Sequence, residues 1–484
     1  MALLMLFLLV VCGLVALTNW RQAIFLTIIL DAVRDLIRKI APGQPVWMSQ
    51  AIVIIWAIIF FSCLSQNLRV LREVRRIFPR LRKGTISFFA ALVPGAFLSV
   101  LLYRYGWILA GLGGLSYVGP LLGMFIGICF AKRSRDVFQL MQIYVVVNSL
   151  VLIGSPAEQL GLGWPGLGGL IGHEWIRHMP GVLVRMVSGF FRSPDIAGFH
   201  AAHVVVFSIL LAVPRARGKS VKLHWLLTGL FGAFALFLAG RRKMFAIPFV
   251  FLVFWVLTDV LRKQRGSKNL LVFVGAVLLF VVGGTMYLAR SDEELEHHQI
   301  YLSTTIYDAV PSLYAHAFQD SVVTVAQSGI LGSGLGIVTQ GAQYAGIDRG
   351  KAWQEDGISR LFKELGVVGV LLLLFAAFHF IAESRRALRM PLQDSTRVLL
   401  QNSGLAIAVA NLACFVSSHQ HISGDVANGV LPLLFLGGVF GHVLGDRASN
   451  AARMPASRPG LQGSPVIPSD ESIAAAFSAS LRGE

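Results

Sequence analysis

Three consecutive cations, Arg241, Arg242 and Lys243, stand between two apolar stretches of the chain. A guanidinium group is planar and can bind two oxygens of one phosphate, so arginines in such a place favour phosphate binding. Attraction to anionic lipid headgroups is the alternative explanation for the same residues. The basic segments on either side, residues 214–222 and 262–268, are both expected on the cytoplasmic face, where loops carry an excess of Lys and Arg. The three cations, one span away from each segment, are therefore expected on the other face.

A second group of polar residues lies in the long segment 289–364. Glu355 and Asp356 are candidate general bases, because a carboxylate can accept a proton from a hydroxyl nucleophile. A carboxylate that only faces water is the alternative for each of them. Gly332, Gly334 and Gly336 alternate along the chain, which predicts tight turns or a close approach of two backbone segments.

Single arginines lie near the same segments. Arg192 precedes an apolar stretch, and its simplest role is that of an anchor at the membrane interface. Arg360 and Glu364 are four residues apart, which predicts an ion pair on a helix. The outer-side arginines that could bind a phosphate are Arg192, Arg241, Arg242, Arg290 and Arg360.

Membrane helices must position these residues. Hydrophobic residues make up 55% of the 484 residues and charged residues 14%, against roughly 25% charged in soluble domains. Long unbroken apolar runs exclude a lipid-facing β-barrel, whose strands alternate. We expect an all-α integral membrane protein with about twelve transmembrane helices. The expected spans are residues 1–18, 48–64, 84–102, 107–130, 137–153, 198–213, 221–239, 244–261, 269–288, 365–382, 400–417 and 426–445.

The apolar part, residues 1–445, is expected to form one membrane domain with two large outer loops, about 154–197 and 289–364. Residues 446–484 are rich in Pro, Ser and Ala, which predicts a disordered cytoplasmic tail. Residues 21–40 are apolar over a short stretch and then polar at helical spacing. This pattern favours an interfacial or re-entrant helix over a tilted span. The polar stripe consists of Asp31, Arg34, Asp35 and Arg38.

The net charge of +17 would suggest nucleic acid binding in a soluble protein, but the positive-inside bias explains it first in a membrane protein. With the N-terminus placed inside, 26 of the 42 Lys and Arg residues fall in inner segments. No nucleic acid partner is therefore expected. The four cysteines fall in apolar stretches and predict neither a disulfide framework nor a zinc site.

Several short motifs resemble those of the O-antigen polymerase and O-antigen ligase superfamily of Wzy-like membrane glycosyltransferases. They are the pair Arg241-Arg242, the Gly-x-Gly-x-Gly of residues 332–336, the acidic Glu355 and the Glu-Leu-Gly-x-x-Gly of residues 364–369. Residues 31–42 also resemble a segment of exopolysaccharide-cluster members. The resemblance covers the membrane plan and the central part of the chain, and it implies a GT-C-like fold.

The resemblance implies a multi-pass protein of the bacterial inner membrane whose active site faces the periplasm or the cell exterior. Its partners would be membrane lipid, an undecaprenyl-pyrophosphate-linked oligosaccharide and other polysaccharide-assembly proteins. Arginines would hold the pyrophosphate, a base would deprotonate the acceptor hydroxyl, and neither a metal nor another cofactor would be required. Ligases of the family carry a His in the long loop, where this chain has Glu355 and Asp356, and this departure favours a polymerase over a ligase.

Two other functions remain open from the sequence. A transporter of lipid-linked glycan or polysaccharide would carry ionisable residues and broken helices within the membrane, whereas the expected spans here are nearly all apolar. A non-catalytic partner in membrane assembly would tolerate the loss of Arg241 and Arg242.

Overall fold

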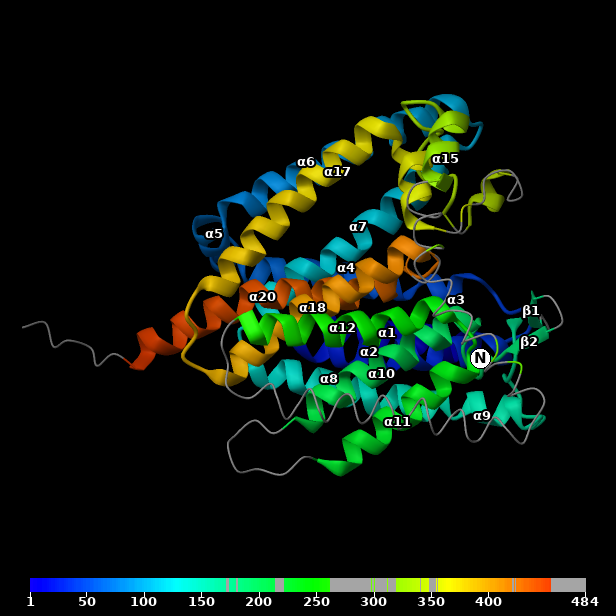
Figure 1. The fold of residues 1–484 in the computed structure, drawn as a ribbon, viewed down its shortest axis with the longest axis horizontal. Helices are drawn as coiled ribbons and strands as arrows, with labels where there is room; N and C mark the ends of the chain where they lie inside the picture. The colour runs from blue at the N-terminus through cyan, green and yellow to red at the C-terminus, as the bar shows by residue number, and fades with distance from the viewer. Residues whose placement is uncertain are drawn as a thin grey trace, which may run out of the picture.

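The computed structural model is a bundle of helices that lie side by side along the long axis of the molecule (Figure 1). It describes residues 1–170, 174–179, 182–213, 222–261, 319–339, 341–347, 356–419 and 424–453, together with residues 297, 300, 311, 354 and 422. One end carries α3 (Trp47–Gln50), α9 (Gly154–Gln159) and the antiparallel strands β1 (Trp175–Met179) and β2 (Val182–Met186). We call it the hairpin end. The opposite end carries α5 (Leu68–Ile77) and is called the α5 end.

The first two helices form an antiparallel pair that crosses the bundle. α1 (Ala2–Thr18) begins at the hairpin end, where Figure 1 marks the N-terminus, and α2 (Trp20–Ile40) returns to that end. At the start of α2, Arg21 pairs with Asp136 (2.5 Å) and donates to the Phe130 carbonyl (3.1 Å) at the α5 end. The sequence predicts the N-terminus on the inner side, together with the basic segment that forms α5. In the structure the N-terminus lies at the opposite end from α5, because residues 20–40 cross the bundle.

The charged stripe of α2 faces the interior of the bundle. α2 packs against α1, α4 (Ile52–Gln66) and α8 (Ser134–Leu152). Arg34 and Asp35 are each only 1% exposed. An interfacial helix would leave these groups in water, so the predicted interfacial position is wrong, although the helical spacing of the stripe is confirmed.

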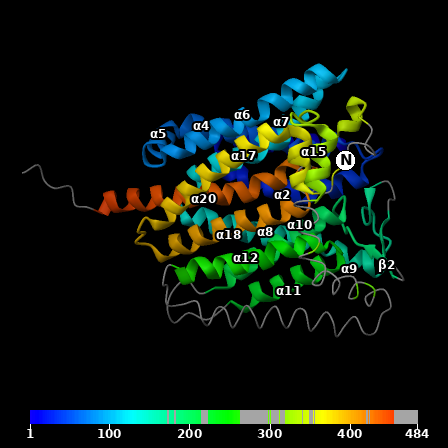
Figure 2. The ribbon, with the colours of Figure 1, turned by 45° about the horizontal axis from the view of Figure 1, so that its top comes forward.

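The long helix α7 (Gly106–Phe130) packs closely against one helix and lies beside a pair of others. α7 packs against α20 (Val426–Arg453) through glycines, because a Cβ on Gly123 would lie 2.1 Å from the Val430 carbonyl oxygen. Gly119 and Gly127 approach α20 as closely, so these three glycines form a close-packing helix face. α6 (Pro79–Leu102) and α17 (Gly357–Arg389) run side by side along one edge of the molecule (Figures 1 and 2).

The centre of the bundle is α10 (Pro194–Ala212), in which every residue is buried. It packs against α8, α11 (Leu223–Leu238) and α12 (Arg242–Leu261), and α12 packs in turn against α18 (Ser395–Ser417). Figure 2 places α11 at the edge opposite to α6. Near the hairpin end, α15 (Asp320–Ser328) lies on α17 and the short 3-10 helix η4 (Ala342–Ala345) lies on α7.

The chain is an all-α multi-pass membrane protein with a small hairpin. Eight helical segments of the described residues are long and apolar enough to cross a membrane. They are residues 47–66, 79–102, 106–130, 134–159, 194–212, 357–389, 395–417 and 426–450.

The remaining four expected spans have different outcomes. Residues 1–18 and 221–239 correspond to α1 and α11, which are apolar but contain only 17 and 16 residues. Residues 244–261 correspond to the helix α12, which is not one of the eight segments. The expected span 269–288 lies outside the described residues. At the other end of the chain, α20 continues to Arg453, within the segment expected to be a tail.

Candidate functional site

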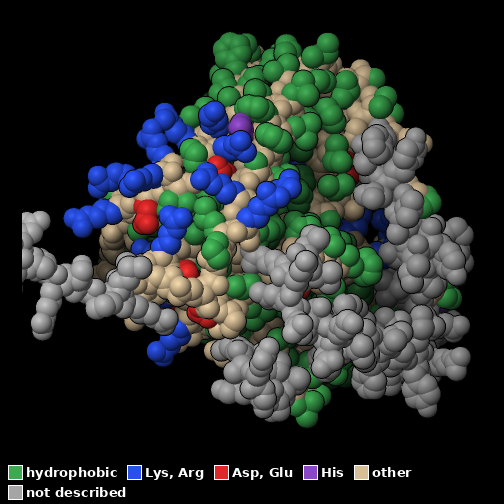
Figure 3. All heavy atoms as spheres, turned by 60° about the vertical axis from the view of Figure 1, so that its left-hand side comes forward, with side chains coloured by type: hydrophobic (Ala, Val, Ile, Leu, Met, Phe, Trp, Pro, Cys, Tyr) green, Lys and Arg blue, Asp and Glu red, His purple; other side chains and the backbone are tan. Residues whose placement is uncertain are grey.

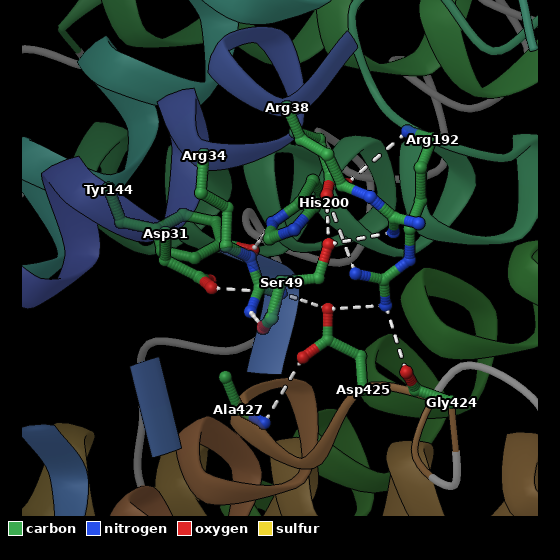
Figure 4. Close-up of polar contacts among 11 residues, drawn as sticks. Asp31, Arg34, Arg38, Ser49, Tyr144, Arg192, His200, Gly424, Asp425 and Ala427 are labelled. Atoms are coloured by element: carbon green, nitrogen blue, oxygen red, sulfur yellow. Dashed lines mark hydrogen bonds and ion pairs between the residues drawn. The ribbon is translucent and has the colours of Figure 1, made fainter. Parts of the chain in front are cut away.

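A network of buried charges joins three segments at the hairpin end (Figure 4). Arg192, which precedes α10, lies 2.8 Å from Asp425 and 3.4 Å from Asp35 of α2. Arg34 of α2 pairs with the same Asp425 oxygen and lies 3.0 Å from Asp31. We call Asp31, Arg34, Asp35, Arg192 and Asp425 the ionic cluster. Its arginines are neutralised by carboxylates from other parts of the chain.

Backbone groups complete the ionic cluster. Arg34 donates to the Ser49 carbonyl (2.6 Å), and Arg192 donates to the Gly424 carbonyl (2.9 Å). The second oxygen of Asp425 accepts the Ala427 N–H (3.2 Å) at the start of α20. Buried charges are retained when they are paired and hydrogen-bonded in this way. Arg192 is thus buried and connects α2 to the segment before α20. The predicted role of Arg192 as an anchor at the membrane interface is wrong.

The next residues of α2 hold the first outer loop. Lys39 donates to the Gly189 carbonyl (2.8 Å) and to the Gly168 carbonyl. Glu158 of α9 accepts the N–H groups of Ser188 (3.1 Å) and Gly189 (2.6 Å). The loop that precedes Arg192 is therefore fixed on both sides by charged hydrogen bonds.

Two histidines of α10 lie beneath the ionic cluster. The hydroxyl of Tyr144 hydrogen-bonds to Nδ1 of His200 (2.8 Å), and Nε2 of His203 lies 3.1 Å from the amide nitrogen of Asn411. His200 also stacks on Phe191 with 4.8 Å between ring centroids. These histidines are packed and hydrogen-bonded inside the bundle.

Arg241 differs from the arginines of the ionic cluster. It lies between α11 and α12 at the hairpin end, pairs with Asp195 in the first turn of α10 (2.9 Å), and has its guanidinium carbon 5.5 Å from the Trp175 ring. Its side chain is 19% exposed. Among the described residues, the buried Nε groups of Arg241 and of Arg34 have no hydrogen-bond partner, so this feature does not separate the two arginines. Arg242 and Lys243, at the start of α12, are half-buried.

Arg360 belongs to a third, separate group. Its Nε lies 3.1 Å from Glu364, which confirms the predicted ion pair, and its guanidinium donates to Ser116 (2.5 Å) and Thr339 (3.1 Å). Glu364 also accepts from the hydroxyl of Tyr117 (2.8 Å). Both Arg360 and Glu364 are buried, and their hydrogen bonds connect α17 to Ser116 of α7 and to Thr339.

The glycine loop, residues 332–336, is threaded between α6, α7 and α17. Gly332, Gly334 and Gly336 all have positive φ (78°, 115° and 91°), a region that L side chains rarely adopt. A Cβ on Gly336 would lie 2.0 Å from the Leu109 carbonyl oxygen. The close backbone approach predicted for these glycines is therefore confirmed.

Hydrogen bonds hold the glycine loop in place. The Ser333 N–H donates to the Lys363 carbonyl (2.7 Å), and the Ser333 carbonyl accepts the hydroxyl of Tyr103 (3.0 Å). Burial raises the pKa of Tyr103, so this hydroxyl remains a donor at neutral pH. The loop is thus a fixed element of the hairpin end.

The candidate bases have different positions. The carboxylate of Asp356 is buried and accepts the Ser359 N–H (2.7 Å) as the N-cap of α17. Glu355 and Arg290 lie outside the described residues. Close by, Nε2 of His419 lies 2.7 Å from the Gln354 carbonyl oxygen. The segment after α18 therefore reaches both the start of α17 and, through Asp425, the ionic cluster.

The candidate arginines do not converge on one point. Arg192 bonds to Asp35 and Arg241 bonds to Asp195, whereas Arg360 bonds to Glu364 of its own helix, Ser116 of α7 and Thr339. Sequence reasoning missed Asp425 and the inward direction of the α2 stripe. Asp425 does carry a sequence signal, because it is an isolated acid between two apolar stretches. Among the described residues, no group of His, Cys, Asp and Glu side chains forms a metal site.

The chain matches no protein-family model and no curated protein.

Proposed function

We propose that the chain is a membrane glycosyltransferase that polymerises lipid-linked oligosaccharide repeat units of the O-antigen or exopolysaccharide type. The donor would be an undecaprenyl-pyrophosphate-linked oligosaccharide, and the acceptor a sugar hydroxyl of another unit. The reaction would take place at the hairpin end, which would face the outside of the inner membrane. The proposal rests on Arg241, an arginine at this end whose side chain is 19% exposed.

Exposure separates Arg241 from the other described candidates. The side chains of Arg192 and Arg360 are 9% and 1% exposed, and their guanidinium groups are already bonded to carboxylates and other oxygens. An incoming phosphate would have to break those bonds. Arg241 would exchange its ion pair with Asp195 and its contact with the Trp175 ring, and its side chain is partly exposed.

The start of α10 supports the same location. Unpaired N–H groups make the N-terminus of a helix favourable for anions. Here the carboxylate of Asp195 occupies the first turn of α10 and pairs with Arg241. A pyrophosphate could take the place of this internal anion, with Arg242 and Lys243 adding positive charge nearby.

The reaction is a single displacement with inversion. The acceptor oxygen forms a bond to the anomeric carbon while the bond from that carbon to the pyrophosphate breaks. The acceptor proton passes to a carboxylate, and the electron pair leaves with undecaprenyl pyrophosphate, whose growing charge Arg241 would stabilise. We assign the base to Glu355, because Asp356 already caps α17.

The test is a reconstitution with lipid-pyrophosphate-linked repeat units, in which released undecaprenyl pyrophosphate and glycan length are measured. Carrier release with longer lipid-linked chains is the expected result. Arg241→Gln should lower release by roughly 100-fold, the cost of losing one charge-stabilising donor. Arg104→Gln is the matched control, because Arg104 is an exposed arginine outside the site, in the turn between α6 and α7.

Other products would change the proposal. Transfer to an acceptor that is not another repeat unit would identify a ligase. No release by folded wild-type protein would reject glycan transfer altogether.

Transport of a lipid-linked glycan is the second candidate, and the ionic cluster favours it. Ionisable residues buried among membrane helices often mark a substrate or ion path. The sequence argued against transport because the expected spans contain almost no ionisable residues. The structure, however, places Arg34, Asp35 and Asp425 inside the bundle. Movement of labelled lipid-linked glycan across proteoliposomes without carrier release would support this second function.

A further inference from the structure

The α5 end carries a dense surface of cations. α5 is amphipathic, and its apolar residues Val70, Val74 and Ile77 are buried against the bundle. Its arginines are exposed on the other side. Figure 3 shows Lys and Arg side chains gathered over this end of the molecule. Because the apolar side of α5 is covered by protein, this helix does not insert that side into lipid as a membrane-anchoring helix would.

The cations continue from α5 onto two neighbouring helices. α6 begins directly after α5, and α17 ends beside it, where the carboxylate of Glu383 accepts the N–H of Arg80 (2.9 Å). This bond joins the start of α6 to the last turns of α17. The combined surface, which we call the basic platform, consists of Arg69, Arg72, Arg75, Arg76, Arg80, Arg82, Lys83, Arg385, Arg386 and Arg389.

The charge of the basic platform is nearly uncompensated. All ten Lys and Arg residues of the platform are exposed. Within the described residues, the ion pair of this surface is between Arg386 and Glu383, at a distance of 3.8 Å. Glu73 is the exposed acid among the α5 arginines. Such an excess of positive charge on a fixed surface attracts anions.

The position of the platform indicates which anion it meets. Beyond the cations, α6 and α17 expose large apolar side chains, including Ile86 (55%), Phe378 (61%) and Ile381 (66%). Figure 3 shows hydrophobic side chains adjoining the cations. Apolar side chains of this kind face acyl chains, so the adjoining cations lie at the level of lipid headgroups. Nine of the ten cations are arginines, whose fork matches the oxygens of a phosphate.

We propose that the basic platform is a binding surface for the phosphate headgroups of anionic phospholipids, shared by α5, α6 and α17. The headgroups would bridge the three helices and neutralise their charges. This surface lies at the end opposite to Arg241, and the inference does not depend on glycan transfer.

The test is a native mass spectrometry titration of the detergent-solubilised full chain with phosphatidylglycerol, using phosphatidylcholine as the neutral reference. Wild-type protein should bind phosphatidylglycerol more tightly than phosphatidylcholine, and added salt should weaken the preference. The variant Arg72→Gln, Arg75→Gln, Arg76→Gln should lose at least about tenfold in phosphatidylglycerol affinity. The matched control, Arg104→Gln, Arg177→Gln, Arg185→Gln, removes three exposed cations elsewhere and should retain the preference.

A second variant separates binding from folding. Arg72→Lys, Arg75→Lys, Arg76→Lys keeps the charge and should retain most of the affinity, with helix content checked by circular dichroism. Equal loss in the glutamine variant and its control would overturn the proposal, because it would indicate net charge alone. Capture of an acidic protein segment, with no preference for phosphatidylglycerol, would also overturn it and identify the surface as a protein-docking site.

Discussion

The arginines of the hairpin end fall into two kinds of environment. Arg192 and Arg360 are enclosed by carboxylates, hydroxyls and carbonyls, which satisfy their guanidinium groups from inside the protein. Arg241 is bonded to one carboxylate, and its side chain is 19% exposed. Residues of one type can thus hold a fold together in one place and remain available to a ligand in another.

The physical difference lies in desolvation. An arginine that has lost its water stabilises the structure only while all of its partners remain. A partly exposed arginine contributes little to stability and can exchange its partner at low cost. Substitutions at these sites should therefore separate effects on unfolding from effects on ligand binding.

The largest loss of stability is expected from Asp425→Asn. Asp425 contacts both Arg34 and Arg192, so its neutralisation removes the charged acceptor that these two buried cations share. We expect a loss of about 3–5 kcal/mol in the free energy of unfolding, measured by thermal or denaturant unfolding in detergent. Glu174→Gln removes an exposed acid 3.9 Å from Arg185 and should cost less than about 1 kcal/mol. Similar losses in the two variants would show that the cluster does not hold the bundle.

Glu364→Gln should have the next largest effect. It removes the charge that faces Arg360 and one acceptor used by Tyr117. We expect a loss of about 3 kcal/mol in the same assay. Glu73→Gln, which removes an exposed acid on α5, serves as the control. If Glu364→Gln leaves the stability unchanged, Arg360 is not needed to hold the fold together and would, like Arg241, be available to a ligand.

Gly336→Ala tests how much the close packing of the glycine loop contributes to stability. The added Cβ would meet the Leu109 carbonyl oxygen at 2.0 Å and would also require a φ of 91°. The expected loss is about 2 kcal/mol. Gly346→Ala separates the two causes, because Gly346 has a φ of 81° but open space around it. An equal loss in both variants would assign the effect to backbone conformation and not to packing.

Arg241→Gln should change stability the least. The expected loss is below about 1 kcal/mol, because Arg241 is partly exposed and forms one ion pair. Carrier release in the reconstituted reaction should nevertheless fall strongly. A variant that unfolds as easily as Asp425→Asn would remove the contrast between the two kinds of arginine.

Local spacing predicted the features that depend on neighbouring residues. The ion pair of Arg360 with Glu364 and the backbone turns of the glycine loop follow from helical spacing and from the φ angles that glycine permits. Most of the expected spans also correspond to long apolar helices, because a membrane helix satisfies its own backbone hydrogen bonds.

Long-range pairing could not be predicted in the same way. The α2 stripe was expected at the membrane interface, because the spacing of its two acids and two arginines does not show which distant segment covers it. Asp425, which pairs with Arg34, lies 391 residues away along the chain. The same limit applies to Arg360, because Ser116 of α7 completes its bonding from 244 residues away.

The position of Asp425 has a consequence for how the chain is made. Arg34 and Arg192 are synthesised long before their shared carboxylate, which comes just ahead of the last described helix. Until that residue leaves the ribosome, Asp31 and Asp35 are the acids within the described part of the chain that pair with these two cations. The N-terminal helices must therefore wait in an incomplete arrangement and close around Asp425 as a late step of assembly.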